Sequence, residues 1–193
     1  MTIDYDLWFP TVIGKIDCPF FNEVQSEYKK HLNLSEDTYQ GYVYHEIHDD
    51  IRFERLNNWI IARVNEFSLK HNVPEKMVPK QSWYNDYHPN GNIPWHKHPG
   101  WIWTATFFLE SDISDSCLEF RSPSYGDNIN GMLKRSPHEH EQVSYNQFTY
   151  ETCKYQPVPG RLIIFRSSIE HMAFNKNPNL TSRVVLTYNF DKE

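Results

Sequence analysis

A pair of histidines separated by one residue, in the stretch 94–100 (PWHKHPG), is the feature of this sequence best suited to chemistry. Side chains two residues apart point to the same side of an extended chain, so His96 and His98 can face one point. A third histidine from a later segment, His171, would complete one triangular face around a divalent metal ion. Such a face leaves the opposite coordination positions open to small molecules.

The scaffold that must position these histidines is most simply one domain, residues 1–193. A chain of this length can bury about 70% of the surface that its unfolded form exposes. Aromatic residues make up 16% of the chain, which favours a β-rich core over a helical bundle. We expect residues 1–80 to form an N-terminal strand and helices, and residues 81–193 to form the β-rich core.

Composition also limits the partners of this chain and its location. The formal net charge of −6 argues against nucleic acid and membrane surfaces as partners, because both attract basic proteins. The sequence has no uninterrupted apolar stretch of the roughly 18 residues that a membrane span needs, and its start lacks a secretory pattern. Three cysteines, Cys18, Cys117 and Cys153, share no metal-type spacing, and their odd number disfavours a disulfide framework. We expect a cytoplasmic protein, and the sequence leaves a homodimer open.

Before residue 80, periodicity predicts one strand and two amphipathic helices. Residues 4–17 fit an opening strand with a turn at Gly14. Apolar positions spaced by three and four predict a helix over 21–34, with Asn22 as the candidate N-cap. A second helix is predicted over 51–71, with its apolar stripe at Phe53, Leu56, Ile60, Val64 and Phe67. Both helices are expected to pack on the outside of a sheet.

From residue 81 onward the pattern changes to period two, in short apolar runs bounded by proline, glycine and asparagine. Strands are predicted at 81–87, 93–98, 102–109, 117–121, 147–155, 161–165, 171–174 and 183–190. Short strands with turns between them are typical of a jelly roll or barrel. The polar segment 122–146, which proline and glycine interrupt, is predicted to be a lid or substrate loop.

The last predicted strand carries a cation on its polar face. Alternation places Arg183, Val185, Thr187 and Asn189 on one face, and Val184, Leu186, Tyr188 and Phe190 on the other. We expect the apolar face to pack toward the helices and the polar face to line the interior of the barrel. A buried arginine is costly without an anion, and a carboxylate is its natural bidentate partner. The interior therefore suits an anionic ligand.

Taken together, these motifs resemble those of the iron- and 2-oxoglutarate-dependent oxygenases, most closely the small prolyl-hydroxylase-like members of phage or bacterial type. The resemblance covers about residues 81–190, with a weaker match of the opening LWFPTVIG. Its motifs are YNDYHPNG, PWHKHPG, TATFFL, PVPGRLIIF, His171 and SRVVLTYNF. It implies a mainly β fold with flanking helices (α+β), a double-stranded β-helix of jelly-roll or cupin-like form with two N-terminal helices. It also implies Fe(II) held by His96, His98 and His171, and 2-oxoglutarate whose distal carboxylate pairs with Arg183.

The same resemblance implies a dioxygenase that consumes 2-oxoglutarate and dioxygen and hydroxylates a C–H bond. Thr187 or Tyr87 could give the cosubstrate a second hydrogen bond, since Tyr87 lies near where some prolyl hydroxylases keep a pocket tyrosine. The substrate is not identified by the sequence. A peptidyl side chain such as proline is suggested by analogy alone.

His98 departs from the general family pattern, which has a carboxylate at this position. Three neutral imidazoles leave a ferrous site one negative charge short. Some members of the nearest subgroup share a His-x-His-Pro run, so the departure need not abolish metal binding. Glu119 could supply the missing carboxylate if its side chain points inward, and Asp86 is a weaker candidate.

Two other readings of the same residues stay open. The first is a cupin, a metal-dependent barrel that uses no 2-oxoglutarate. The His-x-His pair fits a cupin, but the glutamate expected three or four residues later is missing, because Trp101 and Ile102 stand there. The second is a non-catalytic binding or assembly protein that kept the barrel, with zinc or no metal in the site.

Overall fold

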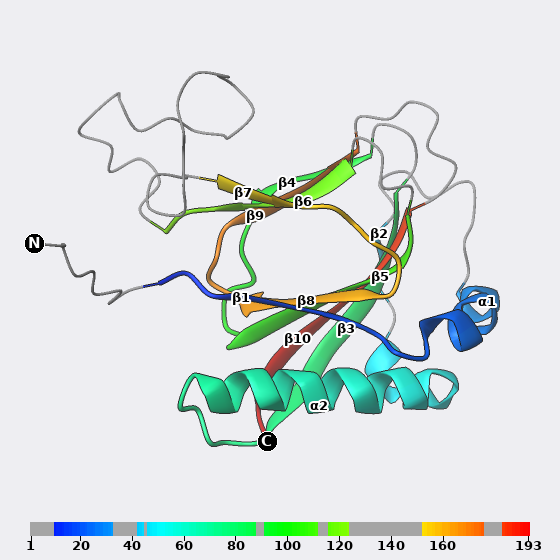
Figure 1. Ribbon diagram of the computed structural model, residues 1–193, viewed down its shortest axis with the longest axis horizontal. Coiled ribbons are helices and arrows are strands. Elements are labelled where there is room, and N and C mark those ends of the chain that lie inside the picture. The colour runs from blue at the N-terminus through cyan, green and yellow to red at the C-terminus, as the bar shows by residue number, and fades with distance from the viewer. Residues whose placement is uncertain are drawn as a thin grey trace, which may run out of the picture.

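The computed structural model of the protein describes residues 10–32, 42–44, 46–87, 91–111, 116–123, 152–175 and 183–193. Two antiparallel sheets face each other (Figure 1). In spatial order the larger sheet comprises β1 (Ile13–Asp17), β8 (Arg161–Arg166), β5 (Trp103–Glu110), β10 (Arg183–Lys192), β3 (Met77–Tyr87) and β2 (Tyr42–Tyr44). The smaller sheet comprises β4 (Asn92–His96), β9 (His171–Asn175), β6 (Ser116–Arg121) and β7 (Thr152–Tyr155). This arrangement confirms the predicted double-stranded β-helix.

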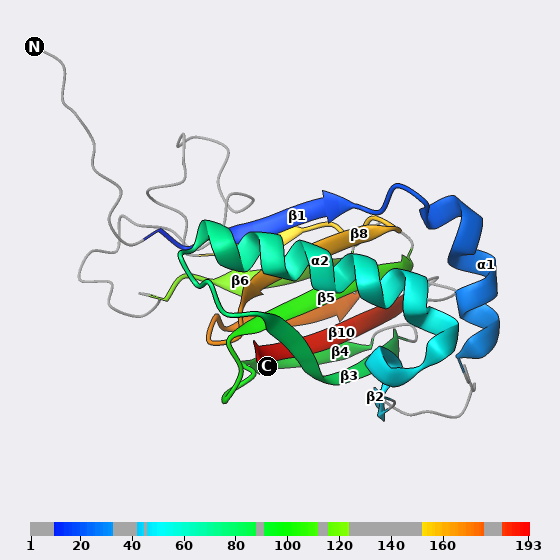
Figure 2. The ribbon, with the colours of Figure 1, turned by 90° about the horizontal axis from the view of Figure 1, so that it is seen from below.

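Two helices cover the larger sheet on its outer face, as the sequence predicts. Helix α1 spans Phe21–His31 and α2 spans Glu54–Lys70, preceded by the 3-10 turns η1 (Ile47–Asp49) and η2 (Ile51–Phe53). Figure 2 shows α2 lying across the strands of the larger sheet. Among the described residues, no helix has the length and apolar character needed to cross a membrane.

The main hydrophobic core lies between these helices and the larger sheet. The predicted stripe of α2 is buried there: Phe53, Leu56, Ile60 and Val64 are fully inaccessible to solvent, and Phe67 packs against the same core. From the sheet side, β10 contributes its apolar face, Val184, Leu186, Tyr188 and Phe190. The predicted division of β10 into a helix-facing side and an interior side is therefore correct.

Two local predictions in the N-terminal part are wrong. Gly14 does not form a turn, because it lies within β1 and pairs with Ile164 of β8. A Cβ atom at this position would come within 2.9 Å of the Phe67 ring, so the glycine lets α2 lie close to the sheet. Asn22 does not cap α1: the helix begins at Phe21 and has no side-chain cap. Residues 4–9 of the predicted first strand lie outside the described residues.

A second, smaller core lies between the two sheets. Its centre is formed by Phe108, Phe120, Ile163 and Phe165, all at most 1% exposed. The side chains of this core fill one part of the space between the sheets, and a cavity occupies another part. Residues 147–151 of the predicted strand over 147–155 lie outside the described residues, and so does nearly all of the predicted lid at 122–146.

Candidate metal centre

Three imidazoles meet between the sheets. His96 ends β4, His98 follows it in the loop, and His171 begins β9 directly opposite His96 in the strand register. Their ring centroids lie 4.2 to 5.1 Å apart, and one nitrogen from each ring lies within 4.8 Å of the other two. The structure therefore brings together the three histidines that the sequence singled out.

Each of these rings is oriented by a hydrogen bond at Nδ1. The partner oxygen is the main-chain carbonyl of Pro94 for His96 at 2.8 Å, and that of Ile169 for His171 at 2.9 Å. For His98 it is the side-chain Oδ1 of Asn189, at 2.7 Å. A carbonyl oxygen only accepts hydrogen bonds, so each Nδ1 carries the proton and each Nε2 keeps its lone pair. Second-sphere acceptors of this kind orient histidine ligands in metal sites.

Burial keeps two of these rings uncharged. His98 is 8% exposed and His171 is 4% exposed. Burial lowers the pKa of His98 to about 4 and that of His171 to about 3. Both imidazoles are therefore neutral near pH 7, which is the form that binds a metal ion.

A cavity of about 670 Å³ opens beside the three rings. The larger sheet contributes one face of two neighbouring strands, the odd-numbered positions 81–87 of β3 and 183–189 of β10. The charged side chains in its wall, other than histidines, are Arg183 and Lys97, and no carboxylate of the described residues lines it. The charges of the cavity wall therefore suit an anionic or neutral ligand.

Arg183 is the buried cation of this cavity. It is 1% exposed, and its guanidinium lies over the ring of Tyr87 with 4.7 Å to the centroid. Its Nη1 donates to the main-chain oxygen of Phe174 at 3.1 Å, but its Nε has no hydrogen-bond partner among the residues that the structure describes. Burial lowers the pKa of Arg183 below its ordinary value, yet arginine stays charged in proteins. A buried cation with an unsatisfied donor is suited to bind an anion.

Further hydrogen-bonding groups lie on the same wall. Tyr87 and Thr187, which the sequence suggested as cosubstrate contacts, both line the cavity and are 6% and 7% exposed. Burial raises the pKa of Tyr87 to about 12, so its hydroxyl keeps its proton and can donate. Asn85 was not predicted, and its Nδ2 is buried without a partner. These groups flank Arg183 on β3 and β10, because Tyr87 pairs with Arg183 and Asn85 pairs with Val185.

The two candidate carboxylates, those of Glu119 and Asp86, do not line the cavity with the three histidines. Glu119 is buried at 8% exposure but does not line the cavity; its neighbour Leu118 does, so alternation turns Glu119 to the other face of β6. There it lies 4.0 Å from Lys154. Asp86 faces away from the cavity in the same manner, between Asn85 and Tyr87, which line it. The suggestion that either residue supplies the missing carboxylate is therefore wrong.

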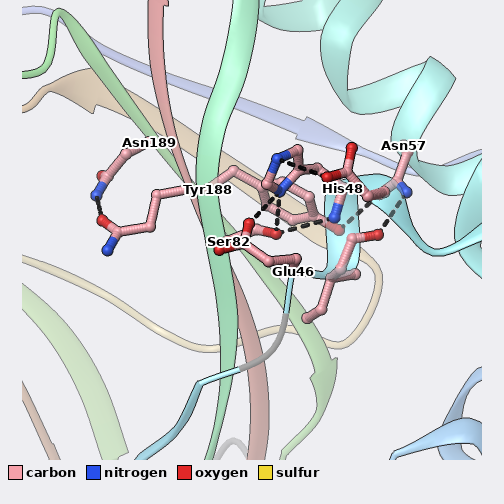
Figure 3. Close-up of polar contacts among 9 residues, drawn as sticks. Glu46, His48, Asn57, Ser82, Tyr188 and Asn189 are labelled. Atoms are coloured by element: carbon pink, nitrogen blue, oxygen red, sulfur yellow. Dashed lines mark hydrogen bonds and ion pairs between the residues drawn. The ribbon is translucent and has the colours of Figure 1, made fainter.

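Asn189 is a second site residue whose role the sequence did not reveal. The alternation of β10 placed it on the interior face, but its partner His98 lies 91 positions earlier in the chain. Its Nδ2 donates to Oε1 of Gln81, a residue of β3 that lines the cavity, at 2.9 Å; Figure 3 draws this contact as the dashed line at Asn189. A separate network, in which His48 contacts Ser82, lies on the other side of the same strand.

The remaining candidates stay apart from the cavity. The cysteines Cys18, Cys117 and Cys153 are all free, as expected without a disulfide framework. A second group that could hold a metal ion, Glu46, His48 and Asp49, lies near the surface. None of these residues lines the cavity.

Comparison with known proteins identifies the class. The model of a family described as "Putative 2OG-Fe(II) oxygenase" matches residues 81–189, more than half of the chain. The chain therefore belongs to this family of iron- and 2-oxoglutarate-dependent oxygenases, whose cofactors are Fe(II) and 2-oxoglutarate. No match was found among curated protein sequences.

Solved structures agree on the fold. The epimerase SnoN from nogalamycin biosynthesis, in complex with Fe3+, alpha ketoglutarate and nogalamycin RO, has a TM-score of 0.64 at 12% identity, covering 94% of this chain and 79% of that one. AviO1 from Streptomyces viridochromogenes Tue57 has a TM-score of 0.62 at 13% identity, covering 94% and 90%. A prolyl-4-hydroxylase from Pseudomonas putida has a TM-score of 0.56 at 12% identity, covering 95% and 94%. At such identities these likenesses show the fold alone.

Proposed function

We propose that this oxygenase is a hydroxylase in which His96, His98 and His171 hold Fe(II) through Nε2 and Arg183 holds the distal carboxylate of 2-oxoglutarate. The observation that carries the proposal is the pairing of two features in one cavity. Three imidazoles with free Nε2 lone pairs converge at one point, and a buried arginine without a carboxylate partner among the described residues lies in the same wall. Each feature is costly to maintain without its ligand.

The donor set fits both cofactors. Imidazole nitrogen is an accepted ligand of Fe(II), and the three rings already have the tautomer that binding requires. The charge that the carboxylate ligand would supply is missing, but 2-oxoglutarate itself brings two negative charges. With three neutral imidazoles, a divalent ion and Arg183, a bound dianion leaves a net charge of about +1 in the site. That remaining positive charge is the one that a carboxylate at position 98 would have cancelled.

The chain's own residues would bind, orient and shield. Arg183 gives a forked contact to the distal carboxylate, and Tyr87, Asn85 and Thr187 donate further hydrogen bonds beside it. The apolar core next to the cavity excludes water from the reacting atoms. When bound, Fe(II) with 2-oxoglutarate and dioxygen supplies the oxidation, in which decarboxylation to succinate is coupled to hydroxylation of a C–H bond. The three histidines would hold the metal ion in the wall of the cavity.

The substrate that we propose to test first is a peptidyl side chain such as proline. The cavity volume of about 670 Å³ lies within the range of small-molecule sites, which leaves room for a side chain beside the ten non-hydrogen atoms of 2-oxoglutarate. The exposed residues of its lining, within the described part of the chain, are Asn92, Pro94, Lys97 and Pro99, which are uncharged or basic. Further support comes from the fold shared with the Pseudomonas putida prolyl-4-hydroxylase. The rival substrate is a free amino acid.

The test has an anaerobic and an aerobic part. Under anaerobic conditions, Fe(II) and 2-oxoglutarate together should give a visible metal-to-ligand charge-transfer band, which neither gives alone. In air, the protein should release succinate slowly even without substrate. His171→Ala should abolish both signals, whereas His71→Ala, at the end of α2 and outside the cavity, should keep them.

Other outcomes would favour the rival readings. A protein that binds Fe(II) but gives no band with 2-oxoglutarate would behave as a cupin-type metal protein. A protein that takes up zinc and ignores 2-oxoglutarate would be a binding or assembly protein that kept the barrel. Either result refutes the proposed hydroxylase.

A further inference from the structure

Asn189 holds a central place in the hydrogen-bond network around His98. It is 2% exposed and lies in β10 on the cavity side. Its Oδ1 accepts from His98 Nδ1 at 2.7 Å and from Thr104 Oγ1 at 3.0 Å, and its Nδ2 donates to Gln81 Oε1. Thr104, fully buried on β5, contacts Ser167 Oγ at 2.8 Å. The amide is therefore held from three sides.

In this network the amide has one orientation, with Oδ1 toward His98 and Thr104 and Nδ2 toward Gln81. Because the single proton of the Thr104 hydroxyl goes to Asn189 Oδ1, the Ser167 hydroxyl must donate to Thr104. His98 is anchored a second time, since its main-chain N–H donates to the Ser167 carbonyl at 2.9 Å. Reversing the Asn189 amide would present an N–H group to His98 Nδ1. The imidazole proton would then have to sit on Nε2, where it would block metal binding.

We propose that Asn189 is a positioning residue that makes an imidazole usable as a ligand at position 98. It keeps the ring proton on Nδ1 and leaves the Nε2 lone pair directed at the metal position; this inference rests on the proposed function. His96 and His171 obtain the same orientation from main-chain carbonyls. Among these three rings, His98 alone has a side chain as its Nδ1 acceptor, so its orientation is the one that a substitution can remove.

The same contact accounts for the departure from a carboxylate ligand. A carboxylate at position 98 would need hydrogen-bond donors behind it, because it only accepts when ionised. In the orientation seen here the Asn189 oxygen faces position 98, so a carboxylate there would require the amide to reverse. The surroundings of position 98 are thus built for a histidine, and His98 is more than a neutral replacement of the usual residue.

The first experiment needs no variant. Two-bond ¹H–¹⁵N spectra of the metal-free protein, with ¹⁵N-labelled histidine, report which ring nitrogen carries the proton. For His98 we expect the proton on Nδ1. If the wild-type ring carries it on Nε2, the proposal is overturned whatever the variants do.

The second experiment compares three variants by spectra and by calorimetric binding of Co(II), a stand-in for Fe(II). Asn189→Leu should move the His98 proton toward Nε2 and weaken Co(II) binding about 10- to 100-fold, the usual cost of losing a second-sphere partner. Asn189→Asp keeps an acceptor oxygen and should retain both the tautomer and the affinity. The matched control is Asn57→Leu, a buried asparagine of α2 whose amide contacts Tyr188 and Ile47 on the other side of the larger sheet (Figure 3).

The outcomes separate the two proposals. If Asn189→Leu weakens Co(II) binding no more than Asn57→Leu does, with the His98 tautomer unchanged, Asn189 has no positioning role. The charge-transfer band of the proposed function is a separate readout. If that band is absent while Asn189→Leu still shifts the tautomer and weakens Co(II), the oxygenase chemistry falls and the role of Asn189 stands.

Discussion

Replacing Arg183 should maintain or raise the stability of the ligand-free protein and should weaken cosubstrate binding. The side chain is 1% exposed, its Nε lacks a partner, and no carboxylate of the described residues pairs with it. Without ligand, the folded protein therefore bears the desolvation cost of a buried charge whose one hydrogen bond within the described part of the chain goes to Phe174. Arg183→Met keeps most of the volume and removes the charge. We expect the free energy of unfolding of the ligand-free protein to stay level or rise by ~1–4 kcal/mol, the range known for apolar replacement of buried ions.

The same substitution should weaken 2-oxoglutarate binding severely. Truncating one partner of a buried, hydrogen-bonded charge pair costs about 2–5 kcal/mol, which is about 30- to 5,000-fold in Kd. Urea denaturation measures the first effect and anaerobic titration of the Fe(II) protein with 2-oxoglutarate measures the second. Arg161→Met is the control, because Arg161 pairs with Asp17 at the surface, 2.8 Å away, and does not line the cavity. It should leave the Kd unchanged and alter stability by about 1 kcal/mol or less.

Two results would refute this reasoning. If Arg183→Met lowers the free energy of unfolding by several kcal/mol, the guanidinium already has a strong partner in the ligand-free fold. If the Kd for 2-oxoglutarate stays within the range of the Arg161→Met control, the anion binds elsewhere. The first outcome refutes the stability argument, and the second removes Arg183 from the cosubstrate site.

Three further predictions test neighbouring groups. Tyr87→Phe should weaken 2-oxoglutarate binding about 10-fold or more in the same titration, since a hydrogen bond to a charged group contributes about 1.5–3 kcal/mol; an unchanged Kd would leave Tyr87 a core residue. His98→Asp, although it creates the usual donor set, should bind Co(II) more weakly than wild type in calorimetry, because Asn189 presents an oxygen to it; equal or tighter binding would contradict the argument from the hydrogen bonds. Because burial lowers the pKa of His98 to about 4 and of His171 to about 3, the unfolded chain takes up these protons first as pH falls. The free energy of unfolding of the metal-free protein should therefore fall below about pH 6.5, by about 1.4 kcal/mol per pH unit for each histidine, until the pKa of that histidine in the folded protein is reached. Urea denaturation at several pH values should show a shallower fall for His98→Gln than for wild type. An equal fall would show that His98 does not contribute to the pH dependence.

The sequence predicted the parts of the fold that depend on local periodicity. The stripe of α2 and the two faces of β10 follow from spacing, because side-chain direction repeats regularly in helices and strands. The resemblance to a known family supplied the architecture and the residues to bring together, His96, His98, His171 and Arg183. The structure places all four in the wall of one cavity.

The features that the sequence did not reveal depend on contacts distant in the chain. Gly14 reads as a turn residue, yet its lack of a side chain accommodates the Phe67 ring. The direction of Glu119 depends on which face of the short strand β6 turns inward, and this is set by its pairing with β9. The role of Asn189 arises from a hydrogen bond across 91 positions, which no local pattern encodes.

The most direct measurement is a crystal structure of the protein with Mn(II) and 2-oxoglutarate, grown without oxygen. We expect one metal ion bound by Nε2 of His96, His98 and His171, and chelated by the oxo-acid end of 2-oxoglutarate. The distal carboxylate should contact the Arg183 guanidinium. A metal ion held by other residues, or a diacid bound away from Arg183, would contradict the account.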